Sequence, residues 1–148
     1  MSDLRDLYQE VIFDHNRNPR NFGKLEGANH QAEGFNPLCG DRLTLYLKVD
    51  EAGIIQEVSF DGQGCAISVA SASLMTEALR GKPVAEAEAL FQAFHDLLTD
   101  GHGHELDLGK LKVLEGVKAY PSRIKCATLA WHTLESALHD EEQPASTE

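Results

Sequence analysis

The sequence predicts an α+β domain: a small antiparallel β-sheet of about three strands covered by several helices, with one helix near each end of the chain. Two observations predict this class. Residues 42–49 alternate between apolar and polar side chains, as a half-buried strand does, and turn residues and a second apolar stretch follow them. Segments with apolar residues at helical spacing lie before and after this pair of strands.

The N-terminal helix is expected from Ser2 to about His15, with Ser2 or Asp3 as its cap. Its apolar residues recur at helical spacing: Leu4, Leu7, Tyr8, Val11 and Ile12. A segment rich in asparagine, proline and glycine then ends the helix. The residues that follow, up to Pro37, are predicted to be irregular or to form an edge strand.

A β-hairpin is expected over residues 42–60. Its first strand, 42–49, presents four apolar side chains to one side: Leu43, Leu45, Leu47 and Val49. Residues 50–53 supply the turn, and residues 54–60 return as the second strand. Three apolar side chains of that strand are predicted to share one face: Ile54, Val58 and Phe60.

Three further helices are predicted after the hairpin. The first, over 66–80, is rich in alanine and serine and ends at Gly81, and its small side chains favour close packing. The second runs from Pro83 to about Leu98, with a buried stripe of Leu90, Phe91, Phe94, Leu97 and Leu98. A short helix is expected within 105–117. The last helix runs from Pro121 to about His139, with an apolar face of Ile124, Ala127, Trp131, Leu134 and Leu138.

The length of 148 residues fits one domain, expected over 1–139 and followed by a disordered acidic tail over 140–148. The net charge of −11 opposes nucleic acid and anionic membrane as partners. No apolar run resembles a signal peptide, and none approaches the roughly 18 apolar residues of a membrane-spanning helix. We therefore expect a cytoplasmic protein.

The three cysteines are an odd number, which argues against a complete disulfide framework and for metal binding, reactivity or plain burial. Cys39 lies directly before the first strand of the hairpin. Cys65 and Cys126 lie near the starts of predicted helices. The positive end of a helix lowers a thiol pKa, so thiolate is available there near neutral pH, and thiolate is the form that binds metal or attacks sulfur.

Asp41 completes a possible four-ligand shell with the cysteines. It follows Cys39 by two residues at the start of a strand, where side chains at such spacing point the same way. Three thiolates and a carboxylate suit Zn(II) or an iron-sulfur cluster. The alternative is that the cysteines are small apolar core residues, since no CxxC pair occurs.

Other polar residues have competing interpretations. Arg123 and Lys125 flank Cys126 and either hold a thiolate ionised or are simply solvated. The pair His102 and His104 is expected to be a polar loop rather than a metal tract. Two other histidines, His15 and His132, are expected to have surface or capping roles. The sequence contains no GxGxxG, P-loop, nucleophile elbow or HExxH motif, which favours a sulfur or metal carrier over nucleotide-driven or hydrolytic enzymes.

Four motifs together resemble the IscU/NifU-N family of iron-sulfur cluster assembly proteins, and more closely its SufU branch. They are Tyr8–His15 with Asn18–Asn21, then Cys39–Asp41, Gly62–Ser68 and Lys125–Trp131. The resemblance spans nearly the whole chain, from Leu7 to about Leu138. Two departures from IscU itself favour the SufU branch. Lys125 stands where IscU has a histidine, and the stretch Gly101–Ser122 looks like the insertion typical of SufU.

The resemblance implies a zinc ion held by Cys39, Asp41, Cys65 and Cys126, and a cysteine desulfurase as the partner that passes on its persulfide sulfur. Cys39 is the expected acceptor, and Cys126 is the second choice. The protein would then be a sulfur carrier, rather than a conventional enzyme, that serves downstream iron-sulfur scaffold or acceptor proteins. Two alternatives are an IscU-type scaffold for a [2Fe-2S] cluster and a structural zinc protein that only binds a partner.

Overall fold

The computed structural model describes residues 4–36, 40–99, 114, 121–138 and 145–146, and it has the predicted α+β class. The helices are α1 (Leu4–Arg17), α2 (Ala66–Leu79), α3 (Val84–Thr99) and α4 (Pro121–Leu138). The strands are β1 (His30–Asn36), β2 (Asp41–Val49), β3 (Ile55–Gln63) and β4 (Ala145–Ser146). None of the helices in the described ranges combines the length and hydrophobicity needed to cross a membrane.

The sheet has the strand order β3-β2-β1-β4, and its first three strands are antiparallel as predicted. The strand β1 forms from residues expected to be irregular or an edge strand. The short β4 pairs in parallel with Gly34 and Phe35 of β1. Two residues of the predicted acidic tail are thus paired with the sheet, and the rest of that tail lies outside the described residues.

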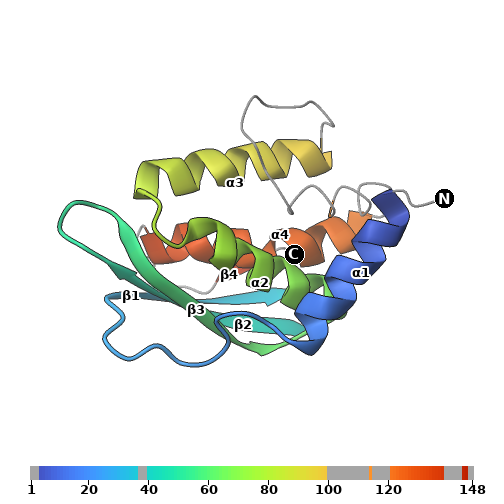
Figure 1. Cartoon of the computed structure of the whole chain (residues 1–148), viewed down its shortest axis with the longest axis horizontal. Helices are drawn as coiled ribbons and strands as arrows, with labels where there is room; N and C mark the ends of the chain where they lie inside the picture. The colour runs from blue at the N-terminus through green and yellow to red at the C-terminus, as the bar shows by residue number, and fades with distance from the viewer. Residues whose placement is uncertain (1–3, 37–39, 100–113, 115–120, 139–144, 147–148) are drawn as a thin grey trace.

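The helices lie on one side of the sheet, with α2 and α4 nearest to it and α3 beyond them (Figure 1). The inward column Leu43, Leu45 and Leu47 is buried, as predicted, and Val58 and Phe60 of β3 continue it. Burial of apolar side chains at about 25 cal/mol per Å² is the main force that holds these layers together. Residues 21–23 pair with Phe60 at the edge of β3, and the chain continues from there to β1.

The apolar face of the second hairpin strand was predicted wrongly at the residues next to the turn. The register shifts between Lys48 and Val49, so that Val49 pairs with Ile55. As a result, Ile55 is fully buried, whereas Ile54 is only half-buried and precedes β3. A bulge adds one residue to one strand and thereby exchanges the faces beyond it. A simple alternation pattern contains no signal for that change.

The polar end of α1 is buried against α2, whereas a surface or capping role was expected for His15. Its side chain is 1% exposed, and its Nδ1 lies 2.7 Å from Ser73 Oγ. The backbone N–H of Arg20 donates to the same Ser73 Oγ, and the Asn21 amide donates to Thr76 Oγ1. The motif after α1 therefore fastens that helix to α2.

The helix α4 packs between the sheet and α3. Trp131 is fully buried, as expected, and stacks on Phe94 with ring centroids 4.9 Å apart. His132 was expected at the surface but is half-buried, with its ring edge-on to Phe91. Burial, and then the neighbouring His95, lowers the pKa of His132. The short helix expected within 105–117 lies outside the described residues except for Leu114, which is buried.

Candidate metal centre

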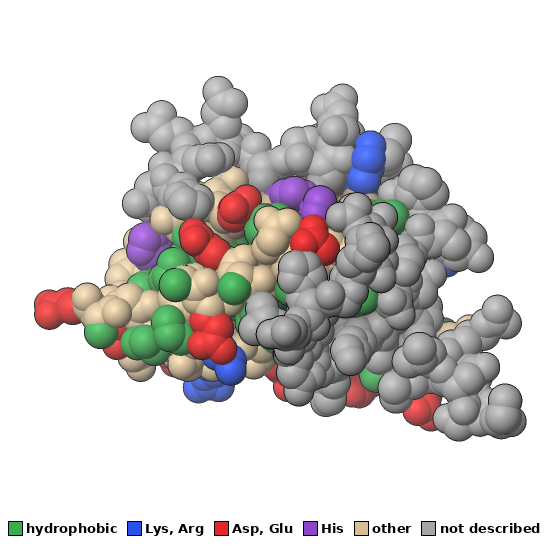
Figure 2. Space-filling view, turned by 90° about the horizontal axis from the view of Figure 1, so that it is seen from above, with side chains coloured by type: hydrophobic (Ala, Val, Ile, Leu, Met, Phe, Trp, Pro, Cys, Tyr) green, Lys and Arg blue, Asp and Glu red, His purple; other side chains and the backbone are tan. Residues whose placement is uncertain are grey.

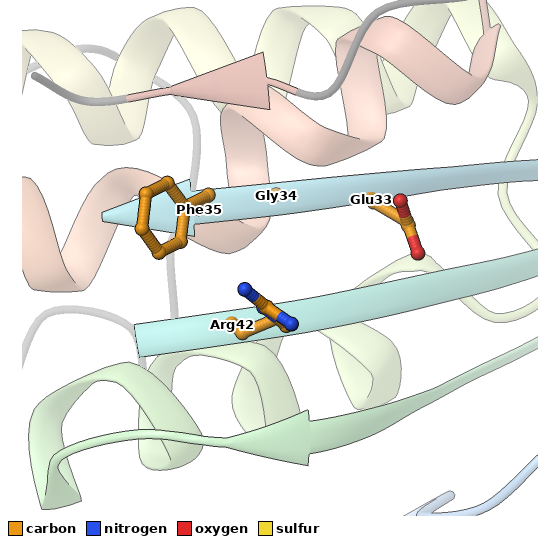
Figure 3. Close-up of a pocket in the computed structure, with 4 residues that line it drawn as sticks. All are labelled: Glu33, Gly34, Phe35 and Arg42. Carbon is orange, nitrogen blue, oxygen red and sulfur yellow. The ribbon is translucent and has the colours of Figure 1, made fainter. Parts of the chain in front are cut away.

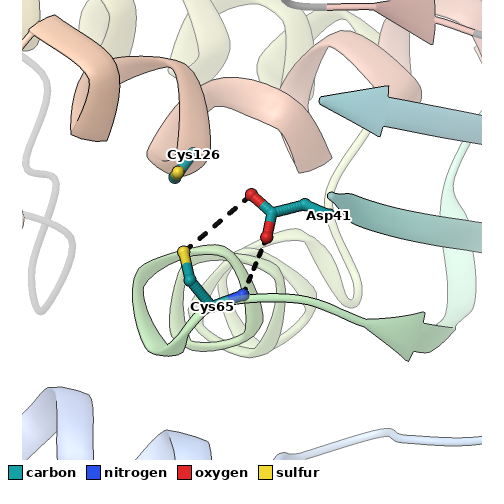
Figure 4. Close-up of side chains that lie close together, drawn as sticks. All are labelled: Asp41, Cys65 and Cys126. Atoms are coloured by element: carbon teal, nitrogen blue, oxygen red, sulfur yellow. Dashed lines mark hydrogen bonds between the residues drawn. The ribbon is translucent and has the colours of Figure 1, made fainter. Parts of the chain in front are cut away.

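Three possible metal ligands from different elements meet at one end of the sheet. One carboxylate oxygen of Asp41 and the Sγ atoms of Cys65 and Cys126 all lie within 4.8 Å of one another (Figure 4). Asp41 is the first residue of β2, Cys65 caps α2, and Cys126 lies in α4. The fold thus brings together three of the four residues that the sequence singled out.

Asp41 is fully buried, and its orientation is determined by hydrogen bonds. Its Oδ1 accepts a hydrogen bond of 2.7 Å from the backbone N–H of Cys65, and its Oδ2 lies 3.9 Å from Cys65 Sγ. Gly64 is necessary for this approach, because a Cβ at that position would lie 2.7 Å from Asp41 Oδ1. The carboxylate is therefore held at the start of α2, with one oxygen directed at the thiols.

Cys65 occupies the N-cap of α2, a position usually taken by serine, threonine, aspartate or asparagine. Its Sγ accepts a hydrogen bond of 3.5 Å from the Ser68 backbone N–H. The pKa of Cys65 is lowered from 9.0 to about 7, chiefly by a hydrogen bond from Cys126; burial and the Asp41 charge oppose the shift, and the Ser68 N–H supports it. A large fraction of this thiol is therefore ionised at neutral pH.

Cys126 is buried on α4, and sequence reasoning missed the residue that connects it to Asp41. The Asn36 amide, at the end of β1, donates to Asp41 Oδ2 at 3.3 Å and to Cys126 Sγ at 3.5 Å. Asn36 is itself fully buried and pairs with Asp41 in the sheet. Only its place before the Pro-Leu-Cys-Gly-Asp stretch hinted at this role.

Cys39, the fourth predicted ligand, lies outside the described residues, as do His102 and His104. Of the described residues on either side of this gap, Gly40 donates its N–H to the Asn36 carbonyl at 2.9 Å. Gly40 has φ +72°, a conformation that glycine adopts without strain. Of the two predicted cations, Arg123 is exposed and Lys125 is half-buried.

The donor set fits a thiophilic metal ion. Two thiols and a carboxylate suit zinc or iron and do not suit magnesium or calcium, which prefer oxygen ligands alone. A tetrahedral zinc ion with bonds of about 2.0–2.3 Å holds its ligand atoms about 3.5–4 Å apart, so the three groups would close in slightly on binding. The buried carboxylate would then be balanced by the charge of the ion.

A surface cavity of about 310 Å³ is lined by Glu33, Gly34, Phe35 and Arg42 (Figure 3). The Arg42 guanidinium carbon lies 5.6 Å from the centroid of the Phe35 ring. None of the three described metal ligands lines this cavity. Seen from the helical side, the described surface carries acidic, apolar and histidine side chains, with few basic ones among them (Figure 2).

Comparison with known proteins identifies the family. The model of the NifU-like N terminal domain matches residues 7–127. The chain is 42% identical over 142 residues to the zinc-dependent sulfurtransferase SufU of Bacillus subtilis (strain 168), which covers 95% of both chains. It is 41% identical to the iron-sulfur cluster assembly scaffold protein IscU of Thermotoga maritima, covering 93% of this chain and 96% of that one.

A solved structure agrees with these sequence relatives. The crystal structure of FiSufU from Fervidobacterium islandicum AW-1 matches with a TM-score of 0.84 and 39% sequence identity, covering 90% of this chain and 98% of that one. The match therefore extends to both sequence and fold. The chain belongs to the family of the NifU-like N terminal domain, as its four motifs predicted.

Proposed function

We propose that this protein binds zinc through Cys39, Asp41, Cys65 and Cys126 and accepts persulfide sulfur from a cysteine desulfurase for iron-sulfur cluster assembly. The observation that carries the proposal is the meeting of Asp41, Cys65 and Cys126 within 4.8 Å. The similarity to a relative named as a zinc-dependent sulfurtransferase supports it. Residues 1–139 would act as a single domain, in the cytoplasm.

The proposed transfer needs no outside oxidant. The Cys39 thiolate attacks the terminal sulfur of the partner's persulfide, a new S–S bond forms on Cys39, and the old S–S bond breaks. The partner's cysteine leaves as thiolate, and Cys39 carries the persulfide. Cys39 is the proposed acceptor because in the sequence it directly precedes Gly40 and Asp41. The Asp41 carboxylate is a harder and more exchangeable ligand than a thiolate.

A bound zinc ion would keep the cysteines ionised and unoxidised without redox chemistry of its own. The protein groups that prepare this state are the Cys65 amide, which holds Asp41, and the Asn36 amide, which contacts both Asp41 and Cys126. These neutral donors stabilise negative charge on the ligands without adding a competing cation. Lys125, in place of the histidine of IscU, leaves Asp41 as the proposed fourth ligand.

The test uses the full chain, purified without oxygen, together with a cysteine desulfurase and L-cysteine. We expect about one zinc ion per chain, and mass spectrometry is expected to find the added sulfur on the peptide that contains Cys39. Cys39→Ala should abolish sulfur loading. Loading that persists unchanged in Cys39→Ala would exclude Cys39 as the acceptor, and a chain that binds no zinc would exclude the zinc site.

A cluster scaffold is the second candidate, favoured by the 41% identity to a protein named as an IscU scaffold. Anaerobic reconstitution with iron, sulfide and the desulfurase separates the two proposals. A stable [2Fe-2S] spectrum, with zinc displaced and the cluster transferable to an acceptor protein, would support the scaffold. We expect zinc to be retained and no stable cluster to form.

A further inference from the structure

Ser68 lies in the first turn of α2, three residues after Cys65. Its side chain is fully buried, and its hydroxyl has no hydrogen-bond partner within the part of the chain that the structure describes. Leaving a buried hydroxyl unpaired destabilises the folded protein, because the hydroxyl loses its hydrogen bonds to water. An unpaired hydroxyl this close to a candidate metal ligand therefore requires a reason.

The helix itself does not satisfy this hydroxyl. Buried serine and threonine side chains inside helices commonly donate to the carbonyl three or four residues earlier. Three threonines of this protein do so: Thr76 to Ser73, Thr128 to Ile124 and Thr133 to Leu129. Ser68 makes no such bond within its described surroundings.

The position of Ser68 on α2 relates it to both thiols. Residues three apart share a helix face, which places Cys65, Ser68 and Ser71 in one column. Ser71 Oγ donates to the carbonyl of Ala127, the neighbour of Cys126, so this column faces α4 at the metal centre. The backbone N–H of Ser68 already donates to Cys65 Sγ. Ser68 therefore lies on the side of α2 that faces α4, the helix that carries Cys126.

We propose that Ser68 is a positioning residue of the metal centre, whose hydroxyl donates a hydrogen bond to the Cys126 thiolate when a metal ion is bound. This inference rests on the proposed zinc site. A thiolate is a stronger acceptor than a neutral thiol, because hydrogen bonds to ionised groups are shorter and stronger. The hydroxyl would therefore be unpaired in the metal-free protein and paired in the metal-loaded protein.

The experiment compares the full-length wild type, Ser68→Ala and a matched control, Ser59→Ala. Ser59 is also buried, and its hydroxyl has no partner among the described residues, but it lies on β3 opposite Tyr46, five residues along β2 from Asp41. Zinc affinity is measured by competition with a coloured chelator, and the stability of the metal-free protein by urea unfolding. Ser68→Ala should weaken zinc binding about tenfold, within the usual range for residues that support a ligand.

The stability of metal-free Ser68→Ala should equal or exceed that of the metal-free wild type, because the variant removes an unpaired hydroxyl. The stability of metal-free Ser59→Ala should likewise equal or exceed that of the metal-free wild type. Its zinc affinity, however, should be the same as that of the wild type. Zinc affinity of Ser68→Ala within about twofold of wild type would overturn the inference, and so would a weaker affinity accompanied by a loss of metal-free stability, which would indicate a packing role. Wild type that binds no zinc would instead disprove the proposed zinc site.

Discussion

Asn36 is the residue on which the centre's geometry most depends, because one amide group contacts two ligands. Asn36→Ala should weaken zinc binding about tenfold by releasing both Asp41 and Cys126. The measurement is chelator competition on folded protein. Asn29→Ala is the control, since the Asn29 side chain bonds the backbone of Val49, at the far end of β2 from Asp41. Equal zinc affinities in the two variants would contradict the role given to Asn36.

Cys65 provides a pH-dependent prediction for the metal-free protein. Because its pKa is lowered to about 7, its thiolate fraction falls below half only when the pH drops below about 7. Alkylation of the Cys65 peptide, followed by mass spectrometry, should reach half its maximal rate near that pH. Cys126→Ala should move the midpoint toward 9.0, because the Cys126 hydrogen bond is the largest cause of the shift. An unmoved midpoint would show that the helix end alone lowers the pKa.

At the scale of elements, the packing of β1 on α4 depends on Gly34. A Cβ there would lie 1.9 Å from Thr133 Oγ1, which no side chain tolerates without movement. Gly34→Ala should lower the free energy of unfolding by about 1–3 kcal/mol, as overpacking does. Urea unfolding measures this loss.

The control for this prediction is the double variant Gly34→Ala with Thr133→Ala. Removing the Thr133 hydroxyl makes room for the new methyl group, so the double variant should be more stable than the sum of the two single losses predicts. If the two losses in the free energy of unfolding are strictly additive, the contact between β1 and α4 is not the cause of the loss in Gly34→Ala.

The elements themselves were largely predictable, and the failures have a common physical origin. The helices and the hairpin follow from local periodicity, which the sequence displays directly. The burial of His15 depends on Ser73, 58 residues away, and the burial of Ile55 in place of Ile54 depends on how β3 pairs with β2. Both are contacts between distant segments, and a local pattern does not contain them.

The candidate metal centre joins three elements of the molecule. Asp41 comes from β2, Cys65 from the start of α2, and Cys126 from α4. A metal ion bound only by the folded chain stabilises it in proportion to the logarithm of its free concentration. Zinc at 100 times its dissociation constant should add about 2.7 kcal/mol to the free energy of unfolding.

Thermal unfolding with and without a chelator checks this prediction. Asp41→Ala should reduce the difference between the two conditions, because it removes one ligand of the site. An unfolding temperature that does not depend on zinc would exclude a site made jointly by these three elements.

The site was predictable in its residue types but not in its supporting groups. Thiols near helix starts and an aspartate two residues from a cysteine were visible in the sequence. Asn36 was not, because its significance comes from the two candidate ligands that it contacts after the chain has folded. Supporting groups of this kind are set by tertiary structure.

The distribution of the ligands along the chain also has a consequence for synthesis on the ribosome. Asp41 and Cys65 emerge together with the sheet and α2, but Cys126 emerges only with α4, the last long helix described. A nascent chain without α4 lacks a thiol ligand, the Cys126 hydrogen bond that lowers the Cys65 pKa, and the hydrophobic cover over the sheet. Metal capture at the proposed centre would therefore have to wait until α4 has been synthesised.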